Sequence, residues 1–281
     1  MANNLSPIIK PQELLVLKQM TPFVLVDARS GAKEKYAASH LEGAFHVDLN
    51  NDLADIKPDA ADGGRHPLPY FPHFNQVLSE LGISPDSHVV IYDDKNGANA
   101  AARFWWMLKS VGHDAVRVLD GGMDAAIRAG YPLSNQAPKR VISTDYQANA
   151  WQLPTADIAE VDKATQNAQC LIIDVREEGR YNGEFEPLDL IAGHIPNAVN
   201  ISFSSNLDAE GFFLPPSELR EKYEKALNEK ETAQVIVHCG SGVTACHTLL
   251  AMAYAGMDIP KLYVGSWSEW SRNNRPMITK P

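Results

Sequence analysis

The sequence feature that most constrains the fold of this chain is an internal duplication. An apolar run that ends in Asp-x-Arg occurs twice, at residues 23–29 and 170–176. Three further pairs follow in the same order in both halves: turns led by His40 and His194, apolar runs at 89–93 and 235–239, and segments at 117–123 and 262–267. Matching positions lie 144 to 154 residues apart. Several features repeated at nearly one offset indicate two copies of one domain.

Each copy alternates short apolar runs with helical patterns. The runs are four to six residues long, too short for helices, and the helical patterns end at Gly112 and Gly256. This alternation predicts an α/β fold in which a parallel sheet carries helices on both faces. We expect domains at 1–135 and 157–281, joined by a polar, proline-broken linker at 136–156. Ligands in such sheets bind beyond the carboxyl ends of the strands.

Composition and charge exclude several classes of function. The chain has 25 Lys and Arg against 35 Asp and Glu, a net charge of −10, which disfavours binding to nucleic acid or to an anionic membrane. No run of 18 uncharged apolar residues occurs. Three cysteines are too few for a disulfide framework and indicate free thiols in a reducing, cytoplasmic compartment. The histidines and cysteines lack metal-ligand spacing, and nucleotide-binding glycine motifs are absent, so we expect no cofactor and no metal.

The most informative string is the one that contains Cys239. This thiol follows the apolar run Val-Ile-Val-His and precedes Gly240, Ser241 and Gly242, after which a helical pattern begins. Glycines allow successive backbone N–H groups to point at one spot, and such a concave site at a helix N-terminus favours a thiolate or another anion. An ordinary buried cysteine in a tight turn is the alternative.

The other cysteines and two nearby histidines have plainer interpretations. Cys246 lies two helical turns into an apolar helix and Cys170 begins an apolar strand, so both are expected to pack in the core. His238 and His247 are expected to be structural, although His238 directly precedes the candidate nucleophile.

Together these residues resemble the two-domain rhodanese-like sulfurtransferases, and among them the 3-mercaptopyruvate sulfurtransferases. The resemblance spans residues 10–275 and depends on the Asp-x-Arg strand ends, the turn at 193–198, the loop at 239–245 and the segment at 263–270. It implies an inactive N-terminal copy, in which Asp93 stands where the second copy has Cys239.

The resemblance also implies a mechanism. Cys239 takes a sulfur atom from a small-molecule donor, 3-mercaptopyruvate, as a persulfide and releases pyruvate; thiosulfate is the alternative donor. The persulfide sulfur then passes to a thiol acceptor, such as thioredoxin or a low-molecular-weight thiol, or to cyanide. Ser241 would relay a proton, with His40 of the first domain facing it; a structural hydrogen bond explains His40 equally well. The expected loop contacts to substrate come from Gly240, Gly242, Val243 and Thr244.

Arginines decide which donor is preferred. Arg180, in a Gly-Arg-Tyr setting, matches the family's substrate arginine and would bind a carboxylate. The family's second arginine follows a Glu-Pro pair, but Leu188 stands there in this chain. This departure leaves open thiosulfate or another sulfur donor, or a different arginine that substitutes. Arg29 and Arg176 are expected to form structural ion pairs with the strand-end aspartates.

Other functions fit less well. A phosphatase of related fold needs an arginine that closes the loop, but Ala245 and Cys246 occupy those positions. A cysteine protease needs a histidine that orients the thiol, and nothing near Cys239 specifies one. A non-catalytic binding module would not need Cys239 in a glycine-rich loop. We expect a monomer or a weak dimer.

Overall fold

The computed structural model describes residues 5–139 and 146–279. The chain forms two compact units. The first comprises Met1–Ala54, Pro69–Gln152 and Ala209–Phe212, and the second comprises Asp55–Leu68, Leu153–Asp208 and Phe213–Pro281. Residues 55–68 thus belong to the second unit although they precede much of the first unit in sequence. The domain limits expected from the sequence, at 135 and 157, assign this segment to the first domain. Residues 140–145 of the expected linker lie outside the described residues.

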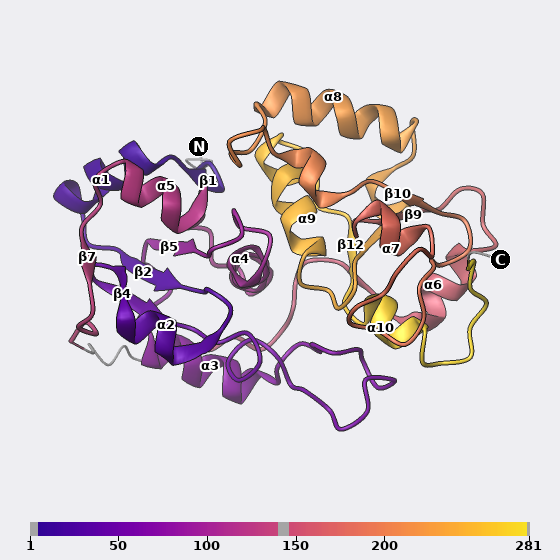
Figure 1. Ribbon diagram of the computed structural model, residues 1–281, viewed down its shortest axis with the longest axis horizontal. Coiled ribbons are helices and arrows are strands. Elements are labelled where there is room, and N and C mark those ends of the chain that lie inside the picture. Colours follow the sequence, from indigo (N-terminus) through magenta and orange to yellow (C-terminus); the bar gives the residue numbers. More distant parts are fainter. Residues whose placement is uncertain (1–4, 140–145, 280–281) are drawn as a thin grey trace. The chain divides into compact units, whose positions relative to one another are not determined.

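A five-stranded parallel sheet forms the centre of the first unit (Figure 1). Its strands, in spatial order, are β1 (Ile8–Ile9), β6 (Val116–Leu119), β5 (Val89–Tyr92), β2 (Val24–Asp27) and β4 (Ala44–His46). The helices of this unit are α1 (Pro11–Met20), α2 (Ala32–Ala38), α3 (Phe71–Glu80), α4 (Ala100–Ser110) and α5 (Gly122–Arg128). Two further short strands, β3 (His40–Leu41) and β7 (Leu133–Ser134), pair antiparallel.

The second unit repeats this arrangement. Its parallel strands, in spatial order, are β10 (Ala198–Asn200), β9 (Leu171–Asp174), β11 (Val235–His238), β12 (Lys261–Tyr263) and β8 (Thr155–Ala156). Its helices are α6 (Ile158–Ala164), α7 (Glu178–Tyr181), α8 (Pro216–Leu227), α9 (Ala245–Tyr254) and α10 (Ser266–Trp270), with 3₁₀ turns η1 (Phe203–Asn206) and η2 (Thr232–Gln234). The first sheet read from β4 to β1 has the same order of equivalent strands as the second sheet read from β10 to β8. This agreement confirms the predicted duplication and the α/β class.

Each core is built in the same way. In the first unit α1 and α5 pack on one sheet face, where Leu14 and Met123 meet Leu25 and Val90. The second unit uses α6 and α10, whose buried side chains include Trp267 and Trp270. Strand side chains alternate between the two faces, so the remaining apolar strand positions point to the opposite helices. The apolar runs are therefore central strands that are buried on both faces, as a parallel sheet covered by helices requires.

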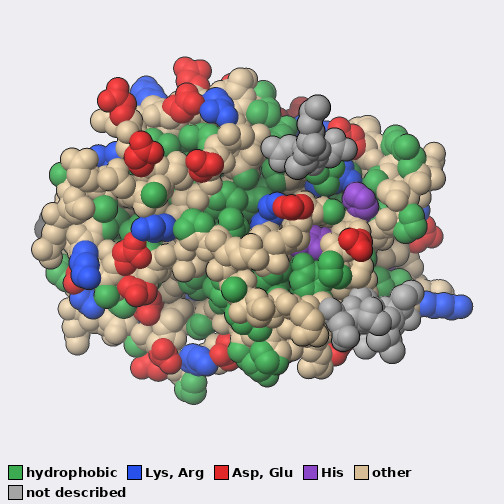
Figure 2. All heavy atoms as spheres, turned by 180° about the vertical axis from the view of Figure 1, so that it is seen from behind, with side chains coloured by type: hydrophobic (Ala, Val, Ile, Leu, Met, Phe, Trp, Pro, Cys, Tyr) green, Lys and Arg blue, Asp and Glu red, His purple; other side chains and the backbone are tan. Residues whose placement is uncertain are grey.

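The surface carries both signs of charge. On the face drawn in Figure 2, the lysine and arginine side chains of the described residues lie scattered among carboxylates and form no continuous basic patch. None of the described helices has the length and apolar character needed to cross a lipid bilayer.

Candidate active site

Cys239 lies where the sequence places it, at the carboxyl end of the central strand β11. The loop of residues 239–244, here the Cys239 loop, connects β11 to α9, and the Cys239 residue is 3% exposed. The backbone carbonyls of Cys239 and Gly240 accept hydrogen bonds from the N–H groups of Trp267 (3.1 Å) and Ser268 (2.8 Å) in α10. The first two carbonyls of the loop are therefore turned toward α10.

Gly242 allows the loop to pack this closely. Its φ is +71°, and a Cβ atom there would lie 2.4 Å from the carbonyl oxygen of Val264. Only glycine fits both the left-handed backbone and the contact with a neighbouring backbone. The backbone conformation of the Cys239 loop thus depends on a glycine at position 242.

Four backbone N–H groups of the loop have no hydrogen-bond partner among the described residues. Within the described part of the chain, the N–H groups of Gly240, Ser241, Val243 and Thr244 donate to no carbonyl and no side chain. Buried N–H groups are normally paired, so this set requires a ligand or water. Donors of this kind at the N-terminus of α9 are what an anion-binding concavity requires.

The equivalent loop of the first unit contains its own acidic side chain. Asp93 follows β5 as Cys239 follows β11, and its buried carboxylate accepts four backbone N–H groups. These donors belong to Lys95 (2.8 Å), Gly97 (2.8 Å), Asn99 (3.1 Å) and Ala101 (3.2 Å). The first unit therefore has no thiol at this position and fills its loop with a side-chain carboxylate. A negatively charged sulfur group on Cys239 would be the counterpart in the second unit.

Ser241 has a histidine partner that the sequence analysis did not identify. The Oγ of Ser241 lies 2.8 Å from Nδ1 of His66, which belongs to the second unit. Gly64 fixes this approach, because a Cβ atom there would lie 2.4 Å from the carbonyl oxygen of Gly265. The signal in the sequence was the string Gly63-Gly64-Arg65-His66-Pro67.

His40, proposed from the sequence to face Ser241, has partners inside the first unit. Its buried ring stacks on Tyr36, with Nδ1 2.7 Å from the carbonyl oxygen of Tyr36 and Nε2 3.2 Å from that of Gln136. The second unit repeats this arrangement, because His194 stacks on Tyr181 and its Nδ1 lies 2.8 Å from the Tyr181 carbonyl oxygen. Because both copies form this contact, a structural role in the domain fold explains it.

Arg180 lies beside the Cys239 loop. A Cβ atom placed on Gly240 would lie 3.3 Å from Nη2 of Arg180. Glu186 holds the guanidinium group, with Oε1 2.7 Å from Nη2 and Oε2 3.1 Å from Nε. Burial raises the pKa of Glu186, but the hydrogen bond from Arg180 and two backbone N–H groups outweigh burial and bring the pKa below its ordinary value. The carboxylate therefore stays ionised and orients the arginine.

The strand-end aspartates form the predicted ion pairs. Asp174 accepts Nε (3.0 Å) and Nη2 (2.6 Å) of Arg176, and Asp27 accepts Nε (2.9 Å) and Nη2 (2.7 Å) of Arg29. Both predicted structural pairs are confirmed. Arg176 also lies over the ring of Trp267, 4.8 Å from its centroid. Burial raises the pKa of Asp174, but His238, whose Nε2 lies 3.7 Å from Oδ2, and the Arg176 guanidinium outweigh burial and lower that pKa.

The remaining sequence candidates lie in the second unit and serve its packing. Cys246 is buried in α9, and its Sγ lies 3.3 Å from the Gly242 carbonyl oxygen. Cys170 packs at the edge of the core, and His238 Nδ1 lies 3.1 Å from the Cys239 carbonyl oxygen. The three cysteines are free thiols. Over residues 5–139 and 146–279, no cluster of three or more histidine, cysteine or acidic side chains could hold a metal ion.

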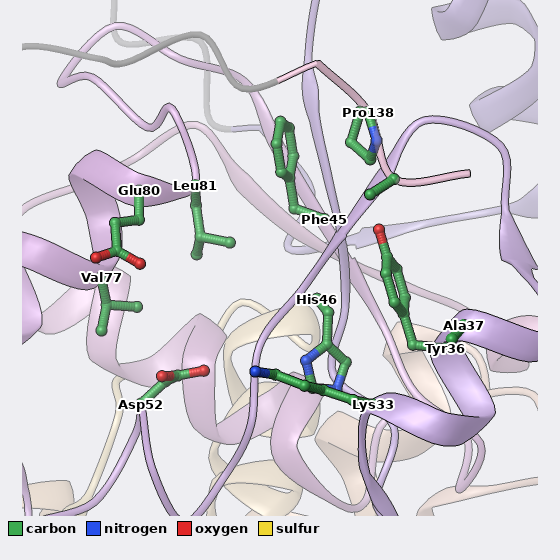
Figure 3. Close-up of a pocket in the computed structure, with 11 residues that line it drawn as sticks. Lys33, Tyr36, Ala37, Phe45, His46, Asp52, Val77, Glu80, Leu81 and Pro138 are labelled. Atoms are coloured by element: carbon green, nitrogen blue, oxygen red, sulfur yellow. The ribbon is translucent and has the colours of Figure 1, made fainter. Parts of the chain in front are cut away.

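The first unit has a cavity of about 400 Å³ of a different character. Apolar side chains of Phe45, Leu81 and Pro138 line one part, and Lys33 and Asp52 lie at another (Figure 3). No cysteine is among its described lining residues.

Comparison with known proteins agrees with this architecture. The sequence matches the rhodanese-like domain twice, over residues 10–129 and 157–273, and the chain therefore belongs to the rhodanese-like family. This confirms the family predicted from the sequence.

Within the family, relatives similar to this chain are named as sulfurtransferases. A probable 3-mercaptopyruvate sulfurtransferase of Pseudomonas aeruginosa is 40% identical over 99% of this chain and 96% of its own length. Thiosulfate sulfurtransferase of Rattus norvegicus is 34% identical over 87% of this chain and 82% of its own length. The structure of 3-mercaptopyruvate sulfurtransferase from Leishmania major superposes with a TM-score of 0.82 at 28% identity and covers 96% of this chain and 75% of that chain.

Proposed function

We propose that this chain is a sulfurtransferase that moves sulfur from 3-mercaptopyruvate through a Cys239 persulfide to an acceptor and releases pyruvate. The observation that carries the proposal is the Cys239 loop, in which a thiol lies beside four backbone N–H groups that have no described partner. The Ser241–His66 contact supplies a route for a proton, and Arg180 supplies a cation.

The first half-reaction breaks the carbon–sulfur bond of the donor. The Cys239 thiolate attacks the donor thiol sulfur, a sulfur–sulfur bond forms, and the electron pair of the broken bond leaves with the carbon as the enolate of pyruvate. The resulting persulfide keeps the donor's thiol proton, or it ionises and accepts hydrogen bonds from the loop N–H groups. Preorganised N–H donors of this kind stabilise the charge without reorganisation.

The enolate then takes up one proton. The Ser241 hydroxyl is the donor that we propose, and His66 Nδ1, 2.8 Å from Oγ, returns a proton to it. We assign this relay to His66 in place of His40, because both ring nitrogens of His40 already lie against backbone carbonyls.

The second half-reaction restores the enzyme. An acceptor thiolate, or cyanide, attacks the outer sulfur of the persulfide, and the Cys239 thiolate leaves. A thiol acceptor requires Cys239 to be reduced, so we propose that the protein works in a reducing compartment, which its three free thiols suit. A monomer or weak dimer remains the expected oligomeric state.

Thiosulfate is the second candidate donor. Leu188 removes the arginine that follows Glu-Pro in mercaptopyruvate enzymes, and one relative of this chain is a thiosulfate sulfurtransferase. Sulfite would then leave in place of pyruvate, and the persulfide on Cys239 would be the same.

Steady-state kinetics with both donors test the proposal. The wild-type chain should release pyruvate from 3-mercaptopyruvate with a higher kcat/KM than it releases sulfite from thiosulfate, and Cys239→Ser should abolish both reactions. Ser241→Ala and His66→Gln should each lower kcat with 3-mercaptopyruvate by about 10²-fold or more, the usual contribution of a positioned acid or base. Cys246→Ser is the matched thiol control and should retain activity. Turnover by Cys239→Ser, or loss only in Cys246→Ser, would contradict the mechanism.

A further inference from the structure

The short helix α10 holds the loop that carries the nucleophile. The N–H group of Trp267 donates to the carbonyl oxygen of Cys239 at 3.1 Å, and the N–H group of Ser268 donates to that of Gly240 at 2.8 Å. The Trp267 side chain is fully buried in the core of the second unit, so α10 cannot shift without disturbing that core. The start of the Cys239 loop is therefore tied to the core through α10.

The same helix holds the segment that carries His66. The N–H group of Arg65, the residue before His66, donates to Oγ of Ser268 at 3.0 Å. The N–H group of Gly63 donates to Oε1 of Glu269 at 3.2 Å. All of these residues belong to the second unit. The backbone just before the histidine is therefore fixed on α10 by two side chains.

Ser268 lies between the two segments that form the proposed proton relay. Its N–H group contacts Gly240, which directly precedes Ser241 in the chain. Its Oγ contacts Arg65, which directly precedes His66. Ser268 is fully buried, so its position is set by packing. This one residue thus fixes the spacing across which His66 Nδ1 lies 2.8 Å from Ser241 Oγ.

Glu269 is placed to accept a backbone N–H group. Its side chain is half-buried, and a Cβ atom on Gly265 would overlap Oε2, so the carboxyl group lies directly against the backbone. Burial raises the pKa of Glu269. A carboxylate, a carboxylic acid and an amide each offer an oxygen that accepts an N–H group. The contact with Gly63 therefore requires the oxygen and does not require the charge.

We propose that Ser268 and Glu269 are positioning residues that hold His66 at hydrogen-bond distance from Ser241. This inference rests on the proposed function and names the residues that set the geometry of its relay. Both side chains act on the backbone of the segment that carries His66. Their effect is therefore confined to the step that needs His66, the protonation of the enolate.

The test compares the two half-reactions in one variant. Glu269→Ala removes the acceptor of the Gly63 N–H group. It should lower kcat for 3-mercaptopyruvate by about 10-fold, because a small displacement of an acid or base removes part of its contribution. KM should stay within about twofold, since ground-state binding of the donor does not involve the relay. Discharge of a preloaded Cys239 persulfide to cyanide needs no proton on carbon, and its rate should change by less than about twofold.

Two further variants separate positioning from support of the fold. Glu269→Gln keeps an oxygen for the Gly63 N–H group and should recover kcat to within about twofold of wild type. The double variant Glu269→Ala/His66→Gln should be no slower than His66→Gln alone, because residues that act through one another lose their effects together.

Other outcomes overturn the inference. Additive losses in the double variant, or equal losses in both half-reactions, would make Glu269 a support of the fold, and no loss would remove it from the relay. If Glu269→Ala does not fold, Ser268→Ala provides the same comparison, since it removes Oγ and keeps the N–H group that holds Gly240; equal losses in both half-reactions again refute the role. Wild-type protein that releases no pyruvate would refute the proposed function itself, a result distinct from the behaviour of the variants.

Discussion

The buried pair of Asp174 and Arg176 gives the sharpest stability prediction. Asp174 accepts three side-chain contacts from Arg176, at 3.0, 3.0 and 2.6 Å, and the arginine side chain is 1% exposed. Asp174→Asn keeps the size of the side chain but replaces one carboxylate oxygen with an N–H₂ group. Donors would then face donors, and a buried guanidinium would lose its nearest counter-charge.

The expected cost follows from what remains. Removing one partner of a buried ion pair costs about 3–5 kcal/mol. Glu186 Oε2 stays 3.3 Å from Nη1 of Arg176, and the Gly193 carbonyl oxygen still accepts Nη2 at 2.6 Å. We therefore expect Asp174→Asn to lower the free energy of unfolding of the second unit by about 3 kcal/mol, the lower end of that range.

Urea unfolding with pulsed cysteine labelling measures this loss. All three cysteines belong to the second unit, and labelling of the buried Cys246 reports its unfolding alone. Glu224→Gln is the control, because its ion pair with Arg220 is exposed and should contribute only about 0.3–0.5 kcal/mol. A loss in Asp174→Asn no larger than the control's would refute the reasoning.

The same pair predicts a dependence on pH. The pKa of Asp174 is lower in the folded state than its ordinary value, so its stabilising effect is complete above that ordinary value, about 3.9, and is lost as the pH falls through the folded-state pKa. Between pH 5 and pH 3 (roughly the range of carboxylate titration), wild-type protein should lose more stability than Asp174→Asn. Parallel curves would contradict the assignment.

Two further predictions concern other parts of the molecule. Gly242→Ala should abolish persulfide formation, because its Cβ would lie 2.4 Å from the Val264 carbonyl oxygen. At Gly130 no atom lies within 4 Å of such a Cβ, so Gly130→Ala should keep activity and lower the free energy of unfolding by only about 1–2 kcal/mol, the cost of its positive φ. Equal activity in both variants would contradict this account of the loop. Burial lowers the pKa of Lys222 to about 8, so the unfolded chain binds one more proton between pH 8 and about 10; wild-type stability should rise over that interval relative to Lys222→Met, and identical curves would contradict the shift.

The fold and the nucleophile could be predicted from the sequence because both depend on local patterns. The repeated strand-end Asp-x-Arg motifs placed β2 and β9, and the glycines after Cys239 placed the loop between a strand and a helix. Each of these motifs spans only a few residues, and its residues favour one particular backbone conformation. The ion pairs of Arg29 and Arg176 join residues only two positions apart, so spacing alone predicted them.

The rest of the site depends on contacts between distant residues. His66 reaches Ser241 across 175 positions, and Arg65 reaches Asp189 across 124. No periodicity connects such residues, and the grouping of 55–68 with the second unit is a property of packing. The turn led by His40 was ambiguous for a different reason. Its motif is conspicuous in the sequence, but both copies use its histidine for the same stacking contact with a tyrosine.

The most direct test of the central claim is a single turnover with one equivalent of 3-mercaptopyruvate and no acceptor, followed by peptide mass analysis of the three cysteines. We predict one pyruvate released per chain and the mass of one added sulfur atom on the peptide that contains Cys239, with the peptides of Cys170 and Cys246 unchanged. Added sulfur on either of those peptides, or pyruvate released without sulfur retained on the protein, would contradict transfer through a Cys239 persulfide.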